Sequence, residues 1–523
     1  MSNDDTLPDN VNDLVALVTI LRERLSHQTL FIDQLLEQIK LAQHHRFGVK
    51  SEHISPDQLR LLLEEGHEQS PEDSDACTGA AQTNEPETTG ANKRTKRGRR
   101  SLPSHLPRVE INHTLDGEAC QCEHCQHRLI PLGQKITEQL DIVPAQVRVI
   151  RHSRQTYQCP HCDDALTTTP LPPQPIPKSN ATPGTLTYLI IAKYLEGMPL
   201  YRLERQLSRY GMSVPRATLA SWMIHCGQLV QPLINLMREQ LLSYDIIAMD
   251  ESRYQVLKEV GKTPQSQSYI WVQRGGPPDT PVILYDYDPS RSQQVPLRLL
   301  EGFKGYLQTD AYEGYGAVCR QNGLVSVGCM AHARRKFDEA LKAQHTVDPN
   351  KQKSTLAATA LAYIQHLYRI EREIKLLSPE VIHHVRQTRS LPVLNELKQW
   401  LYTNIIVVPP RSTLGKAMQY LNKQWDKLTV YTTDGRLRID NNLTENAVRP
   451  FVMGRKSWLF ANSVAGANAS ANLYSLVETA KANGHEPYAY IKHVLTELPA
   501  AKTLEDVEVL LPFNVQMADC VAA

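Results

Sequence analysis

The stretch that decides the fold is Asp245 to Leu257, which reads Asp-Ile-Ile-Ala-Met-Asp-Glu-Ser-Arg-Tyr-Gln-Val-Leu. Its apolar and β-branched residues predict a strand, in which successive side chains point to opposite faces. The alternation places Asp250 with Ala248 on one face and Glu251 with Met249 on the other. Only one of these two acids can therefore face a given site.

The residues that follow predict a sheet built around this strand. A Gly-Gly-Pro-Pro turn at 275–278 separates the next two strands, and a helix at 295–303 precedes a further strand that ends in Asp310. Helix-connected strands tend to lie parallel and adjacent, so a ribonuclease-H-like α/β core would bring Asp250 and Asp310 together. Two carboxylates placed in this way suit magnesium, which prefers oxygen ligands. The three additional strands are expected at 269–273, 281–287 and 305–310.

A third candidate acid lies in the stretch from Ile439 to Phe460. Asn441 and Asn442 are good helix N-caps, and we expect a short helix that Pro450 ends. Glu445 lies on the first turns of this helix. Because it follows Asn442 by three residues, its role could be limited to completing a capping box.

Cations surround Glu445 in the sequence. Arg449 lies one turn later on the same helix face, and Arg455 and Lys456 are expected in the loop that follows. A carboxylate ringed by cations and amides suits a metal site beside phosphate, which is the alternative to the capping role.

The 439–460 stretch resembles the last catalytic block of the insertion sequence 66 family of DDE transposases. In that family a helix opened by Asp-Asn-Asn carries the last of three metal-binding acids, followed by Arg-Pro and Gly-Arg-Lys-x-Trp-Leu-Phe, and this sequence contains the whole series. Met-Asp-Glu-Ser and Leu-Gln-Thr-Asp-Ala-Tyr match the blocks of the first two acids. The resemblance implies that Asp250, Asp310 and Glu445 bind two magnesium ions, for which manganese can substitute, and catalyse DNA strand cleavage and strand transfer.

Length and charge bound the other possibilities. A chain of 523 residues is expected to form several domains, because single cores stop growing near roughly 250 to 300 residues. With 57 Lys+Arg against 56 Asp+Glu, the net charge of +1 excludes a uniformly basic DNA coat. The sequence has no long apolar run and no basic-then-apolar leader, so we expect a cytoplasmic, nucleoid-associated protein without a membrane partner.

Residues 1–63 are expected to form a leucine-zipper-like coiled coil that makes the protein a homo-oligomer. Gln28 is the one polar residue of the seam and could set its register. The alternative is an amphipathic helix that packs on its own chain. Arg46 to Glu52 resembles the segment that follows the zipper in the same family. The seam is Leu14, Val18, Leu21, Leu25, Gln28, Ile32, Leu35 and Ile39.

Residues 64–104 carry almost no large apolar side chains, which predicts a disordered linker. Six cations gather near its end. They could contact DNA phosphates without sequence preference, or they could form only a solvated tail. These cations are Lys93, Arg94, Lys96, Arg97, Arg99 and Arg100.

Residues 105–170 contain two Cys-x-x-Cys pairs, and four thiolates in this pattern suit one tetrahedral structural zinc ion. The ligands are expected to be Cys122, Cys125, Cys159 and Cys162, with a strand from Val143 to Tyr157 between the pairs. Cys120, His124 and His161 are possible substitute ligands, and four free cysteines are the alternative to a zinc site. The family resembled also has a zinc-binding module at this place.

Residues 184–240 predict helices at 186–195 and 200–210, a break at Gly211 and a further helix capped by Ser213 with Pro215 in its first turn. This pattern resembles a helix-turn-helix. An ordinary αα-hairpin packed in the core would have the same buried residues.

The catalytic core is expected at 241–465, interrupted by a helical insertion at about 350–430, and a helical region is expected at 466–523. Cys329 and His332 resemble a Cys-x-x-His element found in several transposase families after the second acid. Two ligands are too few for zinc, so we expect a structural or substrate-positioning role. The following cations, Arg334, Arg335 and Lys336, are expected to meet phosphate.

The sequence therefore predicts a multidomain α+β DNA transposase that binds the terminal inverted repeats of its element and a target DNA. The alternatives are a non-catalytic DNA-binding protein derived from a transposase and a structure-selective nuclease with the same core. Elements of the family resembled usually encode two small accessory proteins, which are possible further partners.

Overall fold

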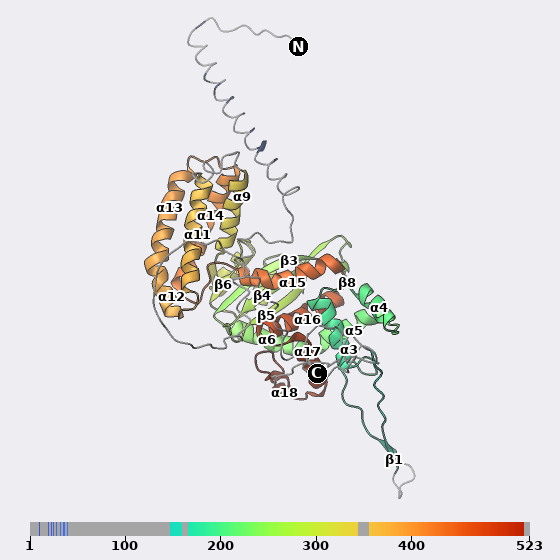
Figure 1. Ribbon diagram of the computed structural model, residues 1–523. Helices are drawn as coiled ribbons and strands as arrows, with labels where there is room; N and C mark the ends of the chain where they lie inside the picture. The colour runs from blue at the N-terminus through green and yellow to red at the C-terminus, as the bar shows by residue number, and fades with distance from the viewer. Residues whose placement is uncertain are drawn as a thin grey trace, which may run out of the picture. The chain divides into compact units, whose positions relative to one another are not determined.

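The computed structural model describes residues 147–158, 166–343 and 355–516, together with single residues between positions 10 and 39. A six-stranded mixed sheet forms in this described part, in the order β5-β4-β3-β6-β7, and β8 pairs with β3 (Figure 1). The strands β3, β4 and β5 form the predicted antiparallel meander, whereas β6, β7 and β8 run parallel to their neighbours. The strands are β3 (Ile246–Lys258), β4 (Gln267–Gly275), β5 (Val282–Asp288), β6 (Tyr306–Gln308), β7 (Val325–Val327) and β8 (Ala461–Ser463).

The register of β3 against β6 brings two predicted site residues to the same edge. Ala248 pairs with Gln308, and Asp250 and Asp310 each lie two residues beyond that pair. The predicted parallel pairing of the first and fourth strands is confirmed. Both acids thus follow the point where β6 ends.

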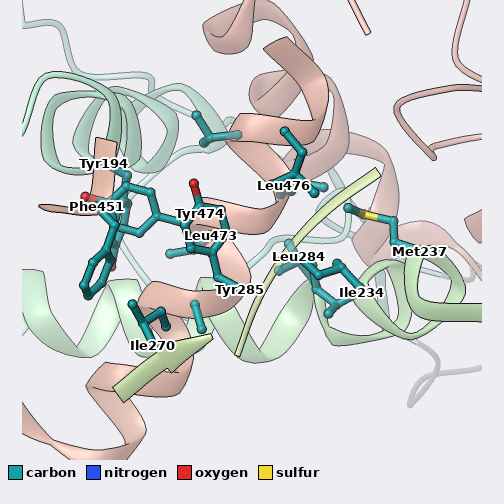
Figure 2. Packing of buried hydrophobic residues seen from close by; sticks show 14 of the residues in the cluster. Tyr194, Ile234, Met237, Ile270, Leu284, Tyr285, Phe451, Leu473, Tyr474 and Leu476 are labelled. Atoms are coloured by element: carbon teal, nitrogen blue, oxygen red, sulfur yellow. The ribbon is translucent and has the colours of Figure 1, made fainter. Parts of the chain in front are cut away.

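Two long helices cover the face of the sheet to which Asp250 belongs. Tyr254 of β3 contacts Phe451 of α15 (Asn442–Trp458), with ring centroids 4.9 Å apart. In α16 (Val464–Ala482), Ser475 and Thr479 accept hydrogen bonds from the N–H groups of β5. Figure 2 shows the aromatic side chains of α15, α16 and β5 packed together in the core below these helices.

The opposite face is covered by α7 (Gln294–Leu299) and α8 (Tyr315–Asn322). Trp271 of β4, which pairs with Glu251, packs edge-on against Tyr315 of α8 at 5.9 Å. Trp271 lies on the same face as Glu251, because paired residues of neighbouring strands share a face. Asp250, the next residue along β3, points to the opposite face.

Five helical segments precede β3 among the described residues, in a part of the chain that was predicted to be helical. Their packing on the core is tight: a Cβ on Gly227 of α5 would lie 2.6 Å from Cα of Ala469 in α16. The segments are α3 (Pro183–Ile190), η2 (Ile191–Leu195), α4 (Leu200–Arg209), α5 (Arg216–Leu229) and α6 (Gln231–Ser243). The helix-turn-helix interpretation stays a prediction.

One detail of this region was predicted wrongly. Helix α5 begins at Arg216 with Pro215 as its N-cap residue, so Ser213 is not the cap. Proline has no side chain that can cap a helix, and the carboxylate of Glu204 in α4 accepts the N–H of Arg216 instead, at 2.9 Å. The positive φ of Gly211, 79°, fits the predicted break.

A second core forms in the predicted insertion, whose described part, from residue 355 onward, is helical. Helix α9, which precedes the insertion, also packs on α11 and α14. The buried residues of this second core include Phe337, Ile364, Leu397 and Leu421. The helices are α9 (Met330–Ala343), α11 (Leu356–Ile374), α12 (Pro379–Val385), η3 (Arg386–Ser390), α13 (Leu391–Ile405), α14 (Thr413–Thr429) and η4 (Val430–Thr433).

This bundle holds a buried ion pair. Arg386 is 3% exposed, and its guanidinium donates to both carboxylate oxygens of Glu371 at 2.9 and 2.6 Å. The remaining bonds go to the carbonyl oxygens of Tyr431, Asp434 and Leu437 at 2.8 to 2.9 Å. Each nitrogen of this buried guanidinium therefore donates a hydrogen bond.

The end of the chain is helical, as predicted: α16 is followed by α17 (Pro487–Glu497), η5 (Leu498–Ala500) and α18 (Leu504–Glu508). Within the described residues, no helix has the length and apolar character that crossing a membrane requires.

Two N-terminal predictions are only partly covered. Residues 147–155 form no regular structure, so the strand predicted from Val143 to Tyr157 is wrong there, and only β1 (Thr156–Gln158) pairs with β2 (Leu166–Thr168). The alternating side chains are exposed, 94% for Val149, so packing within the described residues does not favour a strand. Leu25, Gln28, Ile32, Leu35 and Ile39 are helical and exposed, whereas Leu14, Val18 and Leu21 lie outside the described residues.

Candidate metal centre

Helix α15 carries the third candidate acid and is longer than predicted. It continues through Pro450 to Trp458, so Arg455 and Lys456 lie on the helix and not in a loop. A proline inside a helix removes the bond to the carbonyl four residues earlier. The neighbouring carbonyl of Ala447 accepts the hydroxyl of Tyr285, and Phe451 is fully buried. Tertiary packing holds the helix together where its sequence predicts an end.

The start of α15 is tied to two other elements by Asn441. Its side-chain N–H donates to the carbonyl of Met249 in β3 at 3.1 Å, and its backbone N–H donates to Sγ of Cys329 at 3.3 Å. Asn441 is the N-cap residue, but its side chain makes no capping bond. The capping box predicted for Asn442 and Glu445 is not formed either, because Asn442 is the first residue of the helix and its N–H donates to Oδ1 of Asp440 at 3.2 Å. Asn441 instead positions Glu445 beside the first half of β3 and the start of α9.

Asp250 is a half-buried carboxylate near other acids. Its Oδ1 accepts the N–H of Glu251 at 2.8 Å. Burial raises the pKa of Asp250 to about 7, and repulsion from Glu251, Asp310 and Glu445 adds to the shift. The structure thus brings the three acids predicted for the site into electrostatic range of one another. Among the described residues, Asp250 forms no ion pair that would offset this repulsion.

Glu251, the neighbour of Asp250, has partners of its own. Arg291 donates to its Oε1 at 2.7 Å, and the hydroxyl of Tyr315 donates to its Oε2. Burial raises the pKa of Glu251, while these two hydrogen bonds lower it. The expectation that the two acids face different surroundings is confirmed.

A further cluster joins Glu445 to Cys329 and His332. One possible ligand atom from each residue lies within 4.8 Å of the other two. Burial raises the pKa of Cys329 to about 12 and lowers the pKa of His332. His332 Nε2 is 3.7 Å from Glu445 Oε1, too far for a hydrogen bond, and both His332 Nδ1 and Glu445 Oε1 are buried without a hydrogen-bond partner.

Sequence reasoning singled out all three residues but did not place Glu445 beside Cys329 and His332. Cys329 and His332 lie one turn apart at the start of α9, but Glu445 follows far along the chain. The Cys-x-x-His spacing is the only signal in the sequence. Asp440 was missed, although it opens the Asp-Asn-Asn run: it is 8% exposed, and its carboxylate accepts the hydroxyl of Tyr368 at 2.7 Å.

The predicted cations divide into two groups around α15. Arg335 lies near the acids, with its Nη2 at 3.5 Å from Glu445 Oε2, whereas Arg334 and Lys336 lie over the rings of tyrosines in the insertion. Arg455 and Lys456, in the last turn of α15, line a pocket together with Arg253 of β3. Arg449 is exposed between the two groups.

The other predicted site residues lie outside the described part of the chain. These are the basic run, Lys93, Arg94, Lys96, Arg97, Arg99 and Arg100, and the zinc ligands, Cys122, Cys125, Cys159 and Cys162.

Comparison with family models identifies four regions. The model described as Transposase IS66 family matches residues 178–469, which contain all three acids. The zinc-finger binding domain of transposase IS66 matches residues 119–163, which contain both cysteine pairs. Residues 34–111 match the model described as Transposase C of IS166 homeodomain, and residues 475–513 match the IS66 C-terminal element.

Similar chains cover the sequence almost from end to end. Uncharacterized protein y4jD of Sinorhizobium fredii is 30% identical over 534 residues, which are 98% of this chain and 97% of that protein. Uncharacterized protein y4qI of the same organism is 28% identical over 436 residues, 81% of this chain and 78% of that protein. The resemblance noted in the sequence is confirmed, and the chain belongs to the IS66 family of transposases.

Proposed function

We propose that this protein is an active DNA transposase that binds the ends of its element, cleaves DNA and transfers a DNA 3′ end to a target. The observation that carries the proposal is the convergence of Asp250, Asp310 and Glu445, with Asp250 half-buried and without an ion pair in the part of the chain that the structure describes. Buried charges without partners are costly, so such a group of acids is typical of a site built for a cation. The mixed sheet with its acids at adjacent strands supports a ribonuclease-H-like core.

The residues fit magnesium. Three carboxylates supply oxygen ligands, and Glu445 Oε1 has no hydrogen bond that a cation would have to displace. In this proposal Asp250 and Asp310 hold the cations from the sheet, while Glu445 approaches from α15. Magnesium bound there would activate the attacking oxygen and stabilise the leaving oxygen of an in-line displacement. Asn441 fixes the position of Glu445 by bonding to β3 and to α9.

The cations around α15 support contact with DNA phosphates. Arg455 lies ten residues after Glu445, roughly 15 Å along the helix at 1.5 Å per residue. Arg455, Lys456 and Arg253 would hold the backbone at that distance from the acids, and Arg335 would meet it beside Glu445. The basic run before residue 101 and the helices around α5 are additional candidates for DNA contact.

The N-terminal modules are proposed to assemble and orient the protein. Cys122, Cys125, Cys159 and Cys162 would hold a structural zinc ion, which the zinc-finger match supports. Ile32, Leu35 and Ile39 leave 54%, 43% and 53% of their surfaces exposed in one chain, as seam residues of a homo-oligomeric coiled coil would.

One assay tests the proposal against its two alternatives. Full-length protein is incubated with pre-cut element ends, magnesium and a supercoiled target plasmid. A transposase joins the 3′ ends to the target and gives covalent products that survive denaturation. A structure-selective nuclease would cut without joining, and a DNA-binding protein that lacks catalysis would only shift the ends in a gel. Either of these last two results would overturn the proposal.

A further inference from the structure

Glu445 lies between two groups of side chains that differ in their chemistry. Asp250 and Asp310 are within its electrostatic range and offer only oxygen atoms. Cys329 and His332 offer a sulfur and a nitrogen, and their ligand atoms lie within 4.8 Å of each other and of a Glu445 carboxylate oxygen. Magnesium prefers oxygen ligands, so the second group does not suit it.

The second group is held in place by packing and by hydrogen bonds. Cys329 is 1% exposed and its Sγ accepts the N–H of Asn441 at 3.3 Å. The N–H of Met330, the next residue, donates to the carbonyl of Ile439 at 3.0 Å. The start of α9 and the start of α15 are therefore fixed against each other, and Cys329 and Glu445 are carried by these two starts.

Two polar atoms of this group have no partner among the described residues. His332 Nδ1 and Glu445 Oε1 are both buried without a hydrogen bond. A buried acceptor left without a hydrogen bond costs on the order of 1 to 3 kcal/mol. Such atoms beside a cysteine are explained if a ligand fills the space between them.

We propose that Cys329, His332 and Glu445 form a second metal site, which binds one thiophilic divalent cation of the zinc class. A thiolate, an imidazole and a carboxylate are the ligand types that zinc accepts at about 2.0 to 2.3 Å. Three protein ligands leave one position of a tetrahedral ion open. The thiol loses its proton when it binds the ion.

This site shares Glu445 with the proposed magnesium centre. If the proposed function holds, a zinc-class ion bound to Cys329 and His332 competes with magnesium for the same carboxylate. Zinc would then inhibit strand transfer, and magnesium would relieve the inhibition only at concentrations high enough to recover Glu445. Binding of the ion itself does not depend on the proposed function.

Cobalt binding to the full-length protein tests the site directly. Co²⁺ replaces zinc and gives a near-ultraviolet charge-transfer band when a thiolate is a ligand. Metal-free protein is titrated with Co²⁺ in the wild type and in Cys329→Ser, and bound cobalt is counted after gel filtration. Cobalt bound by the cysteine pairs at 122–125 and 159–162 would be common to both proteins, so the difference between them reports on Cys329.

The wild type is expected to bind one equivalent more than Cys329→Ser, with a stronger charge-transfer band. Cys319→Ser, which changes a cysteine outside the cluster, should behave as the wild type. His332→Asn should also lose the equivalent, and it serves if Cys329→Ser does not fold, because the His332 side chain is 26% exposed. Equal cobalt binding by wild type and His332→Asn would overturn the proposal. A protein that binds the extra ion but transfers no strand in magnesium alone, without cobalt or zinc at this site, would contradict only the proposed function.

Discussion

The acid centre and the helical insertion both bury charge, and they do so in opposite ways. In the insertion, Arg386 is bound by both oxygens of Glu371 and by three carbonyl groups. At the acid centre, Asp250 is surrounded by other acids, and Glu445 keeps a buried oxygen without a hydrogen bond. Both regions lie in the same compact unit of the chain.

This comparison distinguishes a buried charge that stabilises the fold, such as Arg386, from one that is placed to bind a ligand, such as Asp250. A buried ion pair tolerates burial because its hydrogen bonds are complete, and removal of one partner leaves the other uncompensated. At the acid centre, Asp250 has no ion pair among the described residues, and its repulsion with the neighbouring acids makes the metal-free fold less stable until a cation binds. Mutations at the two regions are therefore expected to change stability in opposite directions.

The largest effect on stability is expected in the insertion. Arg386→Ala leaves Glu371 buried without its partner and removes the bonds to three carbonyl groups, so it should lower the free energy of unfolding by about 3 to 5 kcal/mol. The matched control is Arg389→Ala, which breaks the exposed Arg389–Glu373 pair nearby and should cost less than about 1 kcal/mol. Chemical denaturation of both variants measures the difference. An equal loss of unfolding free energy in the two variants would contradict the distinction between the buried and the exposed ion pair.

The opposite sign is expected at Asp250. Asp250→Asn removes the charge that burial and neighbouring acids disfavour, so at pH 8 in a chelator the variant should be more stable than the wild type by up to ~4 kcal/mol. Added magnesium should stabilise the wild type and have little effect on the variant. A variant less stable than the wild type without metal would mean that Asp250 is part of a closed network like that of Arg386.

The pH dependence sharpens this result. The pKa of Asp250 is about 7 in the folded protein, above the value of about 3.9 in an unfolded chain. Between these values the metal-free folded protein keeps a proton that the unfolded chain has released, so the contribution of Asp250 to stability falls as the pH rises from about 4 to about 7. The stability difference between Asp250→Asn and wild type should thus be small at pH 4 and largest above pH 7. A difference independent of pH would contradict the assignment.

The smallest effect is expected next to Asp250, at an acid that has partners. Glu251→Gln weakens the bonds to Arg291 and Tyr315 and should lower stability by about 1 to 2 kcal/mol, with or without magnesium. Thermal unfolding with and without the metal measures both effects. If magnesium no longer stabilised Glu251→Gln, this acid would belong to the metal centre and the comparison between the two neighbours would fail.

Four of the strands and the place of two acids were predictable from the sequence, because alternation and turn residues are local signals, whereas the three-residue strands β7 and β8 were not predicted. The pattern around Asp250 and the Gly-Gly-Pro-Pro turn identified the meander, and the helix before Asp310 indicated the parallel pairing. The insertion was also predictable, since helical periodicity does not depend on distant contacts.

Prediction from the sequence failed where contacts between distant parts of the chain determine the local structure. Pro450 predicts a helix end, but Phe451 is buried among the aromatic residues of the core and α15 continues. Asn441 has the residue type of a cap, and it bonds to Met249 and Cys329 instead. Nothing local to Cys329 and His332 indicates that Glu445 lies beside them. These relations follow from the packing of α9, α15 and β3.

The most direct test of the central claim is magnesium-dependent strand transfer by Glu445→Gln. The change keeps the size of the side chain and one oxygen but removes the charge that would hold a cation. Strand transfer and cleavage should fall together by at least a hundredfold while binding to element ends survives, and Asp250→Asn and Asp310→Asn should behave alike. Glu313→Gln, an exposed acid three residues after Asp310, is the matched control and should remain active. Strand transfer by Glu445→Gln within a few fold of wild type would contradict the account.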